Sequence, residues 1–479
     1  MEHTELSVEY TELTTYDVPP GVVSTWTPFD LADQWQDDDR PLSCDHEAHL
    51  AEGETGSWIG SVLQVPVAYD EDALRRALIA WIARHEALRT TVVPAESATG
   101  TAAEQAGWQR RTLPANAIGV APTEIGWLGA GHSLRYIEDF FATVSPYRWP
   151  HLLFATVVDP DRDSFVLAFG ADHSVMDAYS QLLWFEEIVT LYQRALAGHG
   201  DDEMAELEVG SHVDFSVQDR AAAAALTAES RPVQRWAEWL GEERRFPHFP
   251  VEGVELAPKT GLPQTSISLP LTGRVAAQRL NDVCRELGTS AQSGVLAAIS
   301  ATFQDVWGID RLRYVLPMHT RYQPTDAIAV GWYVGLCPVD LDVSGLSGAR
   351  ELITRAHDVV NADKELVRSP YPRVAELVDA QDGPRFVISY VDTRYVPGAE
   401  HWAEWHARAL RSTSYSDDEV YFWFIRNREG FSVSSRYPAT LGAERSVRAL
   451  VAGVAHYIEA FGHAEALSGV AATGAETVA

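Results

Sequence analysis

Cysteine is scarce in this chain of 479 residues. The three cysteines, Cys44, Cys284 and Cys337, lie far apart and match no spacing of metal ligands. Cys284 falls in a helical pattern and Cys337 in an apolar strand, so both are expected to be small buried side chains, as free cysteines usually are. The sequence therefore implies no metal site.

Long apolar runs are also missing. No run reaches the about 18 residues that a membrane-spanning helix needs. The first residues, Met1 to Leu6, are acidic and lack the basic and then apolar order of a signal peptide. We therefore expect a cytoplasmic protein without a membrane span.

Basic residues are few beside acidic ones. The chain has 37 Lys and Arg against 68 Asp and Glu, a formal net charge of −31. This excess argues against nucleic acid or an anionic membrane as a partner. The sequence also has no GxGxxG after a strand, no Walker loop and no GxSxG elbow. A dinucleotide site, a phosphate loop and a serine elbow are therefore without support.

Apolar material is plentiful, at 46% of the residues with 15 Trp, which predicts a globular protein. A single core stops growing at roughly 250–300 residues, so the length predicts two lobes. We expect an N-terminal lobe at 1–200, a crossover segment at 201–262, a C-terminal lobe at 263–462 and a flexible tail at 463–479.

Hydrophobic periodicity predicts that each lobe combines a sheet with flanking helices. Residues 24–50, rich in Asp and Pro, are expected to form a loop, as are residues 96–105. Strands are predicted at 57–67, 108–113, 149–158, 164–169, 265–269, 312–316, 330–339, 386–391, 420–425 and 431–435. Helices are predicted at 72–88, within 132–145, and at 178–196, 274–287, 290–306, 348–365 and 447–461.

The stretch Phe169–Ser180 carries the most chemistry. An apolar strand ends there in Asp172 and His173, just before an amphipathic helix, so these side chains are expected at the rim of a sheet. His173 is the side chain of this stretch that changes charge readily near neutral pH, which makes it the natural general base. Asp177 lies four residues later, within reach of the same turn. Ser174 is rejected as a nucleophile for His173, since adjacent side chains point apart.

Four segments in order resemble the condensation-domain superfamily, and within it the standalone PapA-type (polyketide-associated protein) acyltransferases. Residues 84–90, RHEALRT, are similar to a helix end of the family, and residues 172–177, DHSVMD, resemble its HHxxxD motif with Asp172 in place of the first His. Arg321 followed by residues 330–333, VGWY, is similar to a later family pattern. Residues 391–398, VDTRYVPG, resemble a segment of the mycobacterial trehalose-ester branch. Together these segments make a specific signal.

This resemblance implies an α/β (α+β) fold in which two chloramphenicol-acetyltransferase-like lobes form a V-shaped pseudo-dimer with a central tunnel. It also implies an acyltransferase or condensation enzyme of nonribosomal peptide or polyketide biosynthesis, without a bound cofactor. The acyl group would arrive as a thioester of CoA or of carrier-protein phosphopantetheine, and a hydroxyl or amine would accept it. His173 would face the tunnel, take the proton of the acceptor and pass it to the leaving thiolate.

The resemblance also implies roles for neighbouring residues. Asp177 is expected to form a structural salt bridge with Arg321, since a buried carboxylate needs such a partner. Asp172 is expected either to orient His173 or to accept backbone N–H groups. Four further residues are candidates for substrate contacts: Tyr179, Ser180, Trp332 and Tyr333. Helix-start roles suit Tyr179 and Ser180 equally, and residues such as Trp332 and Tyr333 are more often part of a core.

Two alternatives stay open at the level of sequence. Asp172, Asp177 and Ser180 spell DxxxxDxxS, the motif of the heterocyclization branch of the same superfamily. Two departures from the family, Asp172 for the first His and Ala178 for the usual Gly, raise this alternative, and the Asp-Phe-Gly-Trp-Gly segment of peptide-forming members is also absent. The third hypothesis is a non-catalytic scaffold that binds a carrier protein. A His173→Ala variant separates an enzyme from a scaffold.

Overall fold

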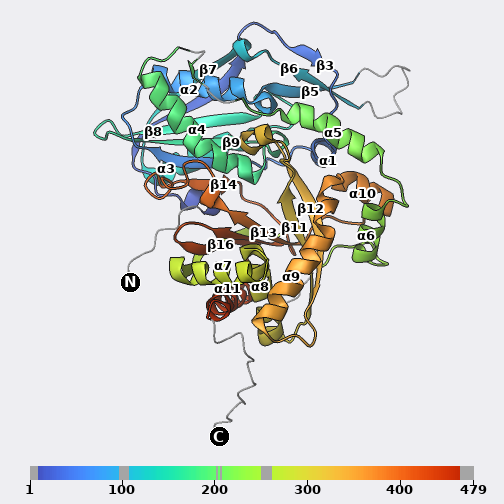
Figure 1. The fold of residues 1–479 in the computed structure, drawn as a ribbon. Coiled ribbons are helices and arrows are strands. Elements are labelled where there is room, and N and C mark those ends of the chain that lie inside the picture. Colours follow the sequence, from blue (N-terminus) through green and yellow to red (C-terminus); the bar gives the residue numbers. More distant parts are fainter. Residues whose placement is uncertain (1–8, 96–106, 201–202, 205–207, 250–260, 464–479) are drawn as a thin grey trace.

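Two lobes, each built on one β-sheet with helices packed against it, make up the protein (Figure 1). The computed structural model describes residues 9–95, 107–200, 203–204, 208–249 and 261–463. The predicted loop at 96–105 and nearly all of the predicted tail at 463–479 lie outside these ranges. None of the helices in the described ranges combines the length and the apolar character needed to cross a membrane.

The first lobe is centred on a seven-stranded sheet with the order β1-β14-β4-β9-β8-β2-β7. Helices α2 (Glu71–Arg84) and α4 (Ala178–Leu196) pack on one face and α3 (Ala130–Phe141) on the other. The strands are β1 (Tyr10–Glu12), β14 (Arg408–Arg411), β4 (Ile59–Val65), β9 (Phe165–Ala171), β8 (Leu152–Val158), β2 (Gly21–Asp30) and β7 (Ile118–Leu128). The predicted hairpin before His173 is confirmed, since β8 pairs with β9 antiparallel.

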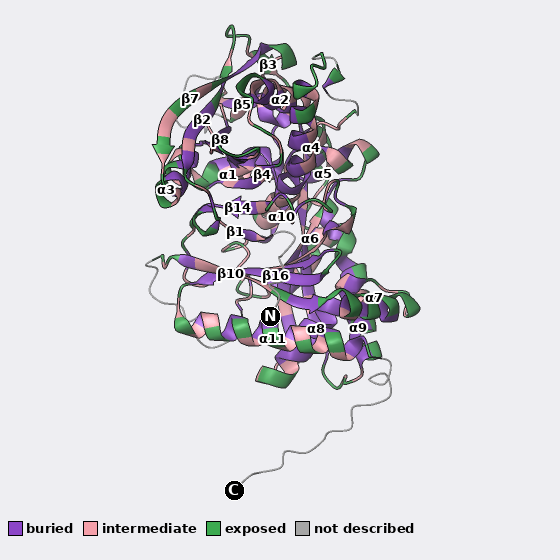
Figure 2. Cartoon of the chain, turned by 90° about the vertical axis from the view of Figure 1, so that its left-hand side faces the viewer, coloured by how far each residue is buried: buried purple, intermediate pink, exposed green. Residues whose placement is uncertain are grey.

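The second lobe holds a six-stranded sheet with the order β10-β16-β15-β13-β11-β12. Its strands are β10 (Gln264–Gly273), β16 (Gly430–Pro438), β15 (Val420–Arg426), β13 (Phe386–Asp392), β11 (Arg311–His319) and β12 (Val334–Asp342). The helices that share its main core are α7 (Arg274–Glu286), α8 (Ala291–Trp307), α9 (Ala349–Asp363) and α11 (Leu441–Phe461). A smaller core gathers α6 (Arg231–Leu240) and α10 (Tyr371–Val378) against other residues of this sheet. Figure 2 shows the buried residues concentrated in the sheets and on the inner faces of these helices.

The predicted loop at 24–50 is wrong. Strand β2 runs on to Asp30, β3 covers Gln36–Asp38, and a helix, α1, covers Cys44–Glu52. Strand β3 joins β6 (Trp108–Thr112) and β5 (Thr90–Pro94) in a small third sheet. The side chain of Ser43 caps α1 by accepting the N–H of His46, and Asp45 and Glu47 suit its first turn. A helix this short and polar forms because one side of it is buried against other elements. Hydrophobic periodicity over so few residues does not predict such a helix.

Residues late in the chain cross back to the first lobe. After β13, the segment that contains Val396, Trp402 and Trp405 packs into the first lobe's core. Strand β14 then enters the first sheet between β1 and β4, with Leu410 opposite Gly60. The predicted boundary at residue 263 therefore does not separate the two sheets. The predicted crossover contains α5 (His212–Ala224) as well as α6.

Candidate active site

His173 stands where strand β9 gives way to helix α4. Asp172 precedes the short 3-10 turn η4 (His173–Val175), and its carboxylate accepts the N–H of Ser174 at 2.9 Å. The backbone N–H of Asp172 donates to the carbonyl of His151 at 2.8 Å, which extends the β8 pairing by one residue. The loop that carries His173 is therefore fixed by the side chain and by the backbone of Asp172, as expected for a side chain held at a sheet rim.

Three elements bring aromatic rings together at His173. The indole of Trp332, from the second lobe, lies 4.1 Å from the imidazole of His173 between ring centroids, inclined by 47°. The imidazole of His49, from α1, lies 6.4 Å from His173 and 5.8 Å from Trp332. We call these three side chains the ring cluster. It sits at the junction of the lobes, because Trp332 and His173 come from different ones.

The environment of His173 favours its neutral form. Burial lowers the pKa of His173 below its ordinary value, and the positive charge of His49 lowers it further, against the opposing effects of its own backbone, Asp172 and Asp177. Its Nδ1 atom is buried and has no hydrogen-bond partner among the described residues. A neutral imidazole is the form that accepts a proton.

The predicted salt bridge between Asp177 and Arg321 is present. The two side chains are 1% and 3% exposed, and Nη1 and Nη2 of Arg321 donate to the carboxylate at 2.6 and 2.9 Å. The N–H groups of Ser180 and Tyr333 also donate to Asp177, at 2.8 and 3.0 Å. Burial alone would raise the pKa of Asp177, but the charge and hydrogen bonds of Arg321 outweigh it and hold the pKa below its usual range.

The four candidates for substrate contacts lie in different settings. Trp332 is half-buried, and its indole packs against the imidazole of His173. Tyr179 is half-buried, with the guanidinium of Arg321 5.0 Å from its ring. Ser180 and Tyr333 are buried against the Asp177–Arg321 pair, and Arg321 lies 4.6 Å from the ring of Tyr333. Contact of any of these residues with a substrate stays a prediction.

The RHEALRT segment ties the first lobe together around the site. Arg84 and His85 both reach Glu187 of α4, at 3.2 and 2.9 Å. The other ring nitrogen of His85, Nδ1, accepts the N–H of Val330 at 3.3 Å, just before Trp332. Through His85, these contacts connect α4 of the first lobe to the loop that carries Trp332.

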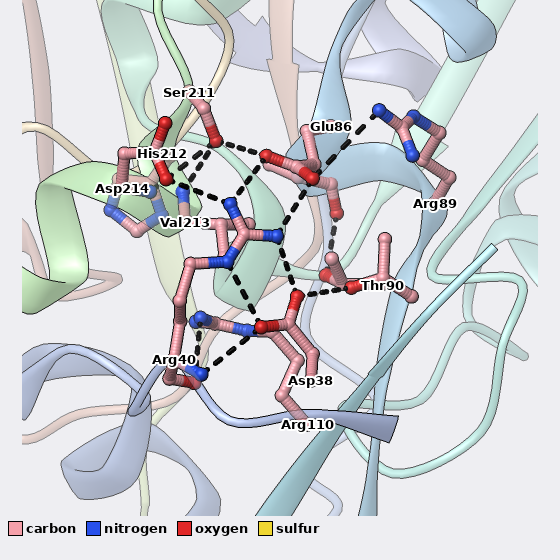
Figure 3. Close-up of polar contacts among 12 residues, drawn as sticks. Asp38, Arg40, Glu86, Arg89, Thr90, Arg110, Ser211, His212, Val213 and Asp214 are labelled. Atoms are coloured by element: carbon pink, nitrogen blue, oxygen red, sulfur yellow. Dashed lines mark hydrogen bonds and ion pairs between the residues drawn. The ribbon is translucent and has the colours of Figure 1, made fainter. Parts of the chain in front are cut away.

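Glu86 of the same segment belongs to a second polar network (Figure 3). Arg40 donates to Asp38 at 2.6 Å, to Glu86 at 2.8 Å and to Asp214 at 2.8 Å, and Glu86 also binds Ser211, the N-cap of α5. The first residue of α5, His212, donates from Nε2 to the carbonyl oxygen of Trp332 at 2.9 Å. The network therefore anchors the start of α5, which in turn holds Trp332.

His49 is the site residue that sequence reasoning missed. Its Nε2 lies 3.0 Å from Oδ1 of Asp172, although the two residues are 123 positions apart. No local signal pointed to it, because its helix was taken for a loop. No group of three or more His, Cys, Asp or Glu side chains in the described ranges is arranged to hold a metal ion.

Comparison with known proteins places this geometry in a family. Residues 48–392 match the family model of the Condensation domain. Acyltransferase PapA3 of Mycobacterium tuberculosis is 25% identical over 316 residues, which cover 64% of this chain and 65% of PapA3. Trehalose-2-sulfate acyltransferase PapA2 of Mycobacterium bovis is 28% identical over 278 residues, 54% of this chain and 56% of that protein. The matched region thus spans less than two thirds of these relatives.

Solved structures share the fold. A PapA2 acyl transferase superposes with a TM-score of 0.83 at 21% identity, covering 95% of this chain and 99% of the other. The epimerization domain of the third module of tyrocidine synthetase B superposes with a TM-score of 0.66 at 15% identity, covering 91% and 99%. These likenesses confirm the predicted fold class of two chloramphenicol-acetyltransferase-like lobes, and the similarity to PapA-type acyltransferases confirms the predicted resemblance. The chain belongs to the condensation domain family.

Proposed function

We propose that the protein is an acyltransferase that moves an acyl group from a CoA or carrier-protein thioester to a hydroxyl or amine, with His173 as the general base. The observation that carries the proposal is the position of His173, at the junction of the two lobes and in an environment that favours the neutral imidazole. The family and the names of the relatives support the reaction class.

The chemistry needs one proton carrier. The acceptor O–H or N–H gives its proton to the imidazole as the oxygen or nitrogen attacks the thioester carbonyl carbon. The tetrahedral intermediate then collapses, the C–S bond breaks, and the imidazolium returns the proton to the leaving thiolate. General-base help of this kind contributes about 10²–10⁴-fold, and positioning of the two reactants can contribute more.

The heterocyclization alternative assigns catalytic work to Asp172 and Asp177. Both carboxylates are already engaged, Asp172 with His49 and Asp177 with Arg321. A carboxylate held in an ion pair has a depressed pKa and is a poor proton acceptor. Simple acyl transfer through His173 is therefore the better supported reaction.

Incubation of the purified protein with donor and acceptor panels, followed by mass spectrometry of the products, tests the proposal. The donors are acyl-CoAs and acylated carrier proteins. The acceptors are sugars, polyketide alcohols and amines, and a sulfated trehalose comes first because the relative PapA2 is named for one. We expect an acylated product from the unaltered protein and a severe loss of it with His173→Ala.

A matched control removes an imidazole elsewhere. His132 is exposed on α3, and His132→Ala should leave product formation unchanged. Equal product from His173→Ala and the unaltered protein would contradict the proposed base. Retained carrier-protein binding with no product from any donor and acceptor pair would favour the scaffold alternative.

A further inference from the structure

Beside His173 lies a second pair of ionisable groups that the proposed reaction does not use. His49 places Nε2 3.0 Å from Asp172, and its Nδ1 lies 3.7 Å from Glu52, one turn later on α1. The side chain of His49 is 10% exposed and that of Asp172 is 4% exposed. A histidine held between two carboxylates in this way is positioned to be a cation.

His49 and His173 differ in charge at neutral pH. Burial by itself would lower the pKa of His49, but the hydrogen bonds and charges of Asp172 and Glu52 outweigh it and raise the pKa to about 9. Burial would raise the pKa of Asp172, but His49 and Ser174 hold it at about 2. At neutral pH, His49 is therefore protonated while the neighbouring His173 is neutral.

We propose that His49 is a positioning residue for His173: held by Asp172, it fixes the turn that carries His173 and presents a positive charge that keeps His173 unprotonated. This inference rests on the proposed role of His173 as general base. Asp172 stands where the family motif has its first histidine. In this protein the histidine that pairs with this position is His49, which comes from α1 and lies outside the motif.

Among the described residues, none of the other titratable groups that act on the two histidines supplies a positive charge beside His173. His46 and His151 also interact electrostatically with His49, but burial lowers the pKa of each, so both are neutral at neutral pH. The groups that act on His173 are His49, Asp172 and Asp177, and Asp177 is neutralised by Arg321. Glu52, the remaining carboxylate at His49, has a side chain that is largely exposed and therefore screened.

The test separates charge from shape with two substitutions. His49→Gln keeps a hydrogen bond to Asp172 and removes the charge, whereas His49→Lys keeps the charge and changes the shape. The titration of His173 is followed in each variant by NMR of protein labelled at histidine carbons, with His173→Gln to assign the signal. No substrate is needed, so the outcome does not depend on the proposed reaction.

We expect the titration midpoint of His173 to move to higher pH in His49→Gln and to stay near that of the unaltered protein in His49→Lys. Equal midpoints in all three proteins, or equal displacement in both variants, would overturn the proposal. The unaltered protein provides a test that requires no substituted protein to fold. There His49 must still be protonated at the pH at which His173 loses its proton, and a lower midpoint for His49 than for His173 would overturn the proposal.

Activity distinguishes the inference from the function on which it rests. Once a donor and acceptor pair is found, the acid limb of kcat/KM should move to higher pH in His49→Gln and return in His49→Lys. Failure to find any reaction would count against the proposed function and leave the NMR result standing. If the reaction occurs and the acid limb of kcat/KM stays at the same pH in His49→Gln, the positioning role of His49 is contradicted. The proposed role of His173 as general base would then still stand.

Discussion

Arg321 of the second lobe donates from both terminal nitrogens to both carboxylate oxygens of Asp177 in the first, at 2.6 and 2.9 Å. The same carboxylate accepts the N–H of Tyr333, and the carbonyl of Gly331 accepts the N–H of Asp177 at 3.1 Å. This buried joint fixes the loop that carries Trp332 relative to the turn that carries His173. It therefore sets the relative positions of Trp332 and His173 in the candidate site.

Asp177→Ala should destabilise the protein by about 3–5 kcal/mol, because it leaves the Arg321 guanidinium buried and unpaired. Urea unfolding measures the change. The control is Glu365→Ala, which removes a carboxylate from an exposed ion pair with Arg368 and should change stability by at most about 0.5 kcal/mol. An Asp177→Ala protein with full stability and no turnover would show that Asp177 acts in the chemistry.

His173→Ala should lower turnover by about 10²–10⁴-fold, the usual contribution of a general base. Stability should change little, since the ring is only partly enclosed and makes no hydrogen bond through Nδ1. Steady-state kinetics and thermal unfolding are measured on the same samples. A proportional loss of folded protein and of activity would indicate a structural histidine instead.

Trp332→Ala should reduce kcat/KM by up to about 10²-fold, because the indole is the ring packed against His173 and a small displacement of a reacting group is costly. Trp332→Phe retains an aromatic ring and should recover most of the activity. Comparing the two variants by steady-state kinetics separates ring packing from indole-specific contacts. Equal activity in Trp332→Ala and the unaltered protein would exclude Trp332 from the site.

Arg40→Ala should destabilise the protein by about 1–3 kcal/mol, since it leaves the carboxylates of Asp38 and Glu86 with fewer partners (Figure 3). Local loosening should appear at α5 and at Trp332, because Glu86 and Ser211 anchor that helix. Hydrogen exchange measured by mass spectrometry locates the change. Arg75→Ala, in a more exposed network on α2, is the control and should leave exchange at α5 as it is.

The buried neutral histidines should contribute a loss of stability as the pH drops below about 6.5. Burial lowers the folded-state pKa of His46, His151 and His173, and holds that of His212 at about 4, so the unfolded chain binds more protons in this range. Urea unfolding at several pH values measures the slope. His212→Gln should reduce the loss of stability between pH 6.5 and pH 4, and equal slopes in the variant and the unaltered protein would contradict the neutral state of His212 in the folded protein.

The opposite behaviour is expected of His49. Its folded-state pKa is raised to about 9, so its contribution to stability is complete below about pH 6.5 and is lost as the pH rises towards 9. Unfolding experiments in this alkaline range compare the unaltered protein with His49→Gln. The variant should lose less stability between pH 6.5 and 9, and parallel curves would show that His49 carries no extra proton in the folded state.

The sequence by itself determined the elements with strong periodicity and the residues that lie at their ends. The hairpin β8–β9 and the helix after it place His173 at a strand end, and the hairpin β15–β16 and the helix α8, capped by Ser290, also follow from local patterns. Local hydrogen bonding and apolar spacing decide such elements, so a short window of residues contains the information. The family motifs added the pairing of Asp177 with Arg321.

Only the tertiary structure decided what depends on distant partners. Helix α1 gains its stability from burying one side against other elements, β14 leaves one lobe to complete the sheet of the other, and His49 meets Asp172 across 123 residues. No periodicity encodes such contacts, since each side chain gains its partner only when separate elements pack together. The rim position of His173 was therefore readable from the chain, whereas the charge beside it was not.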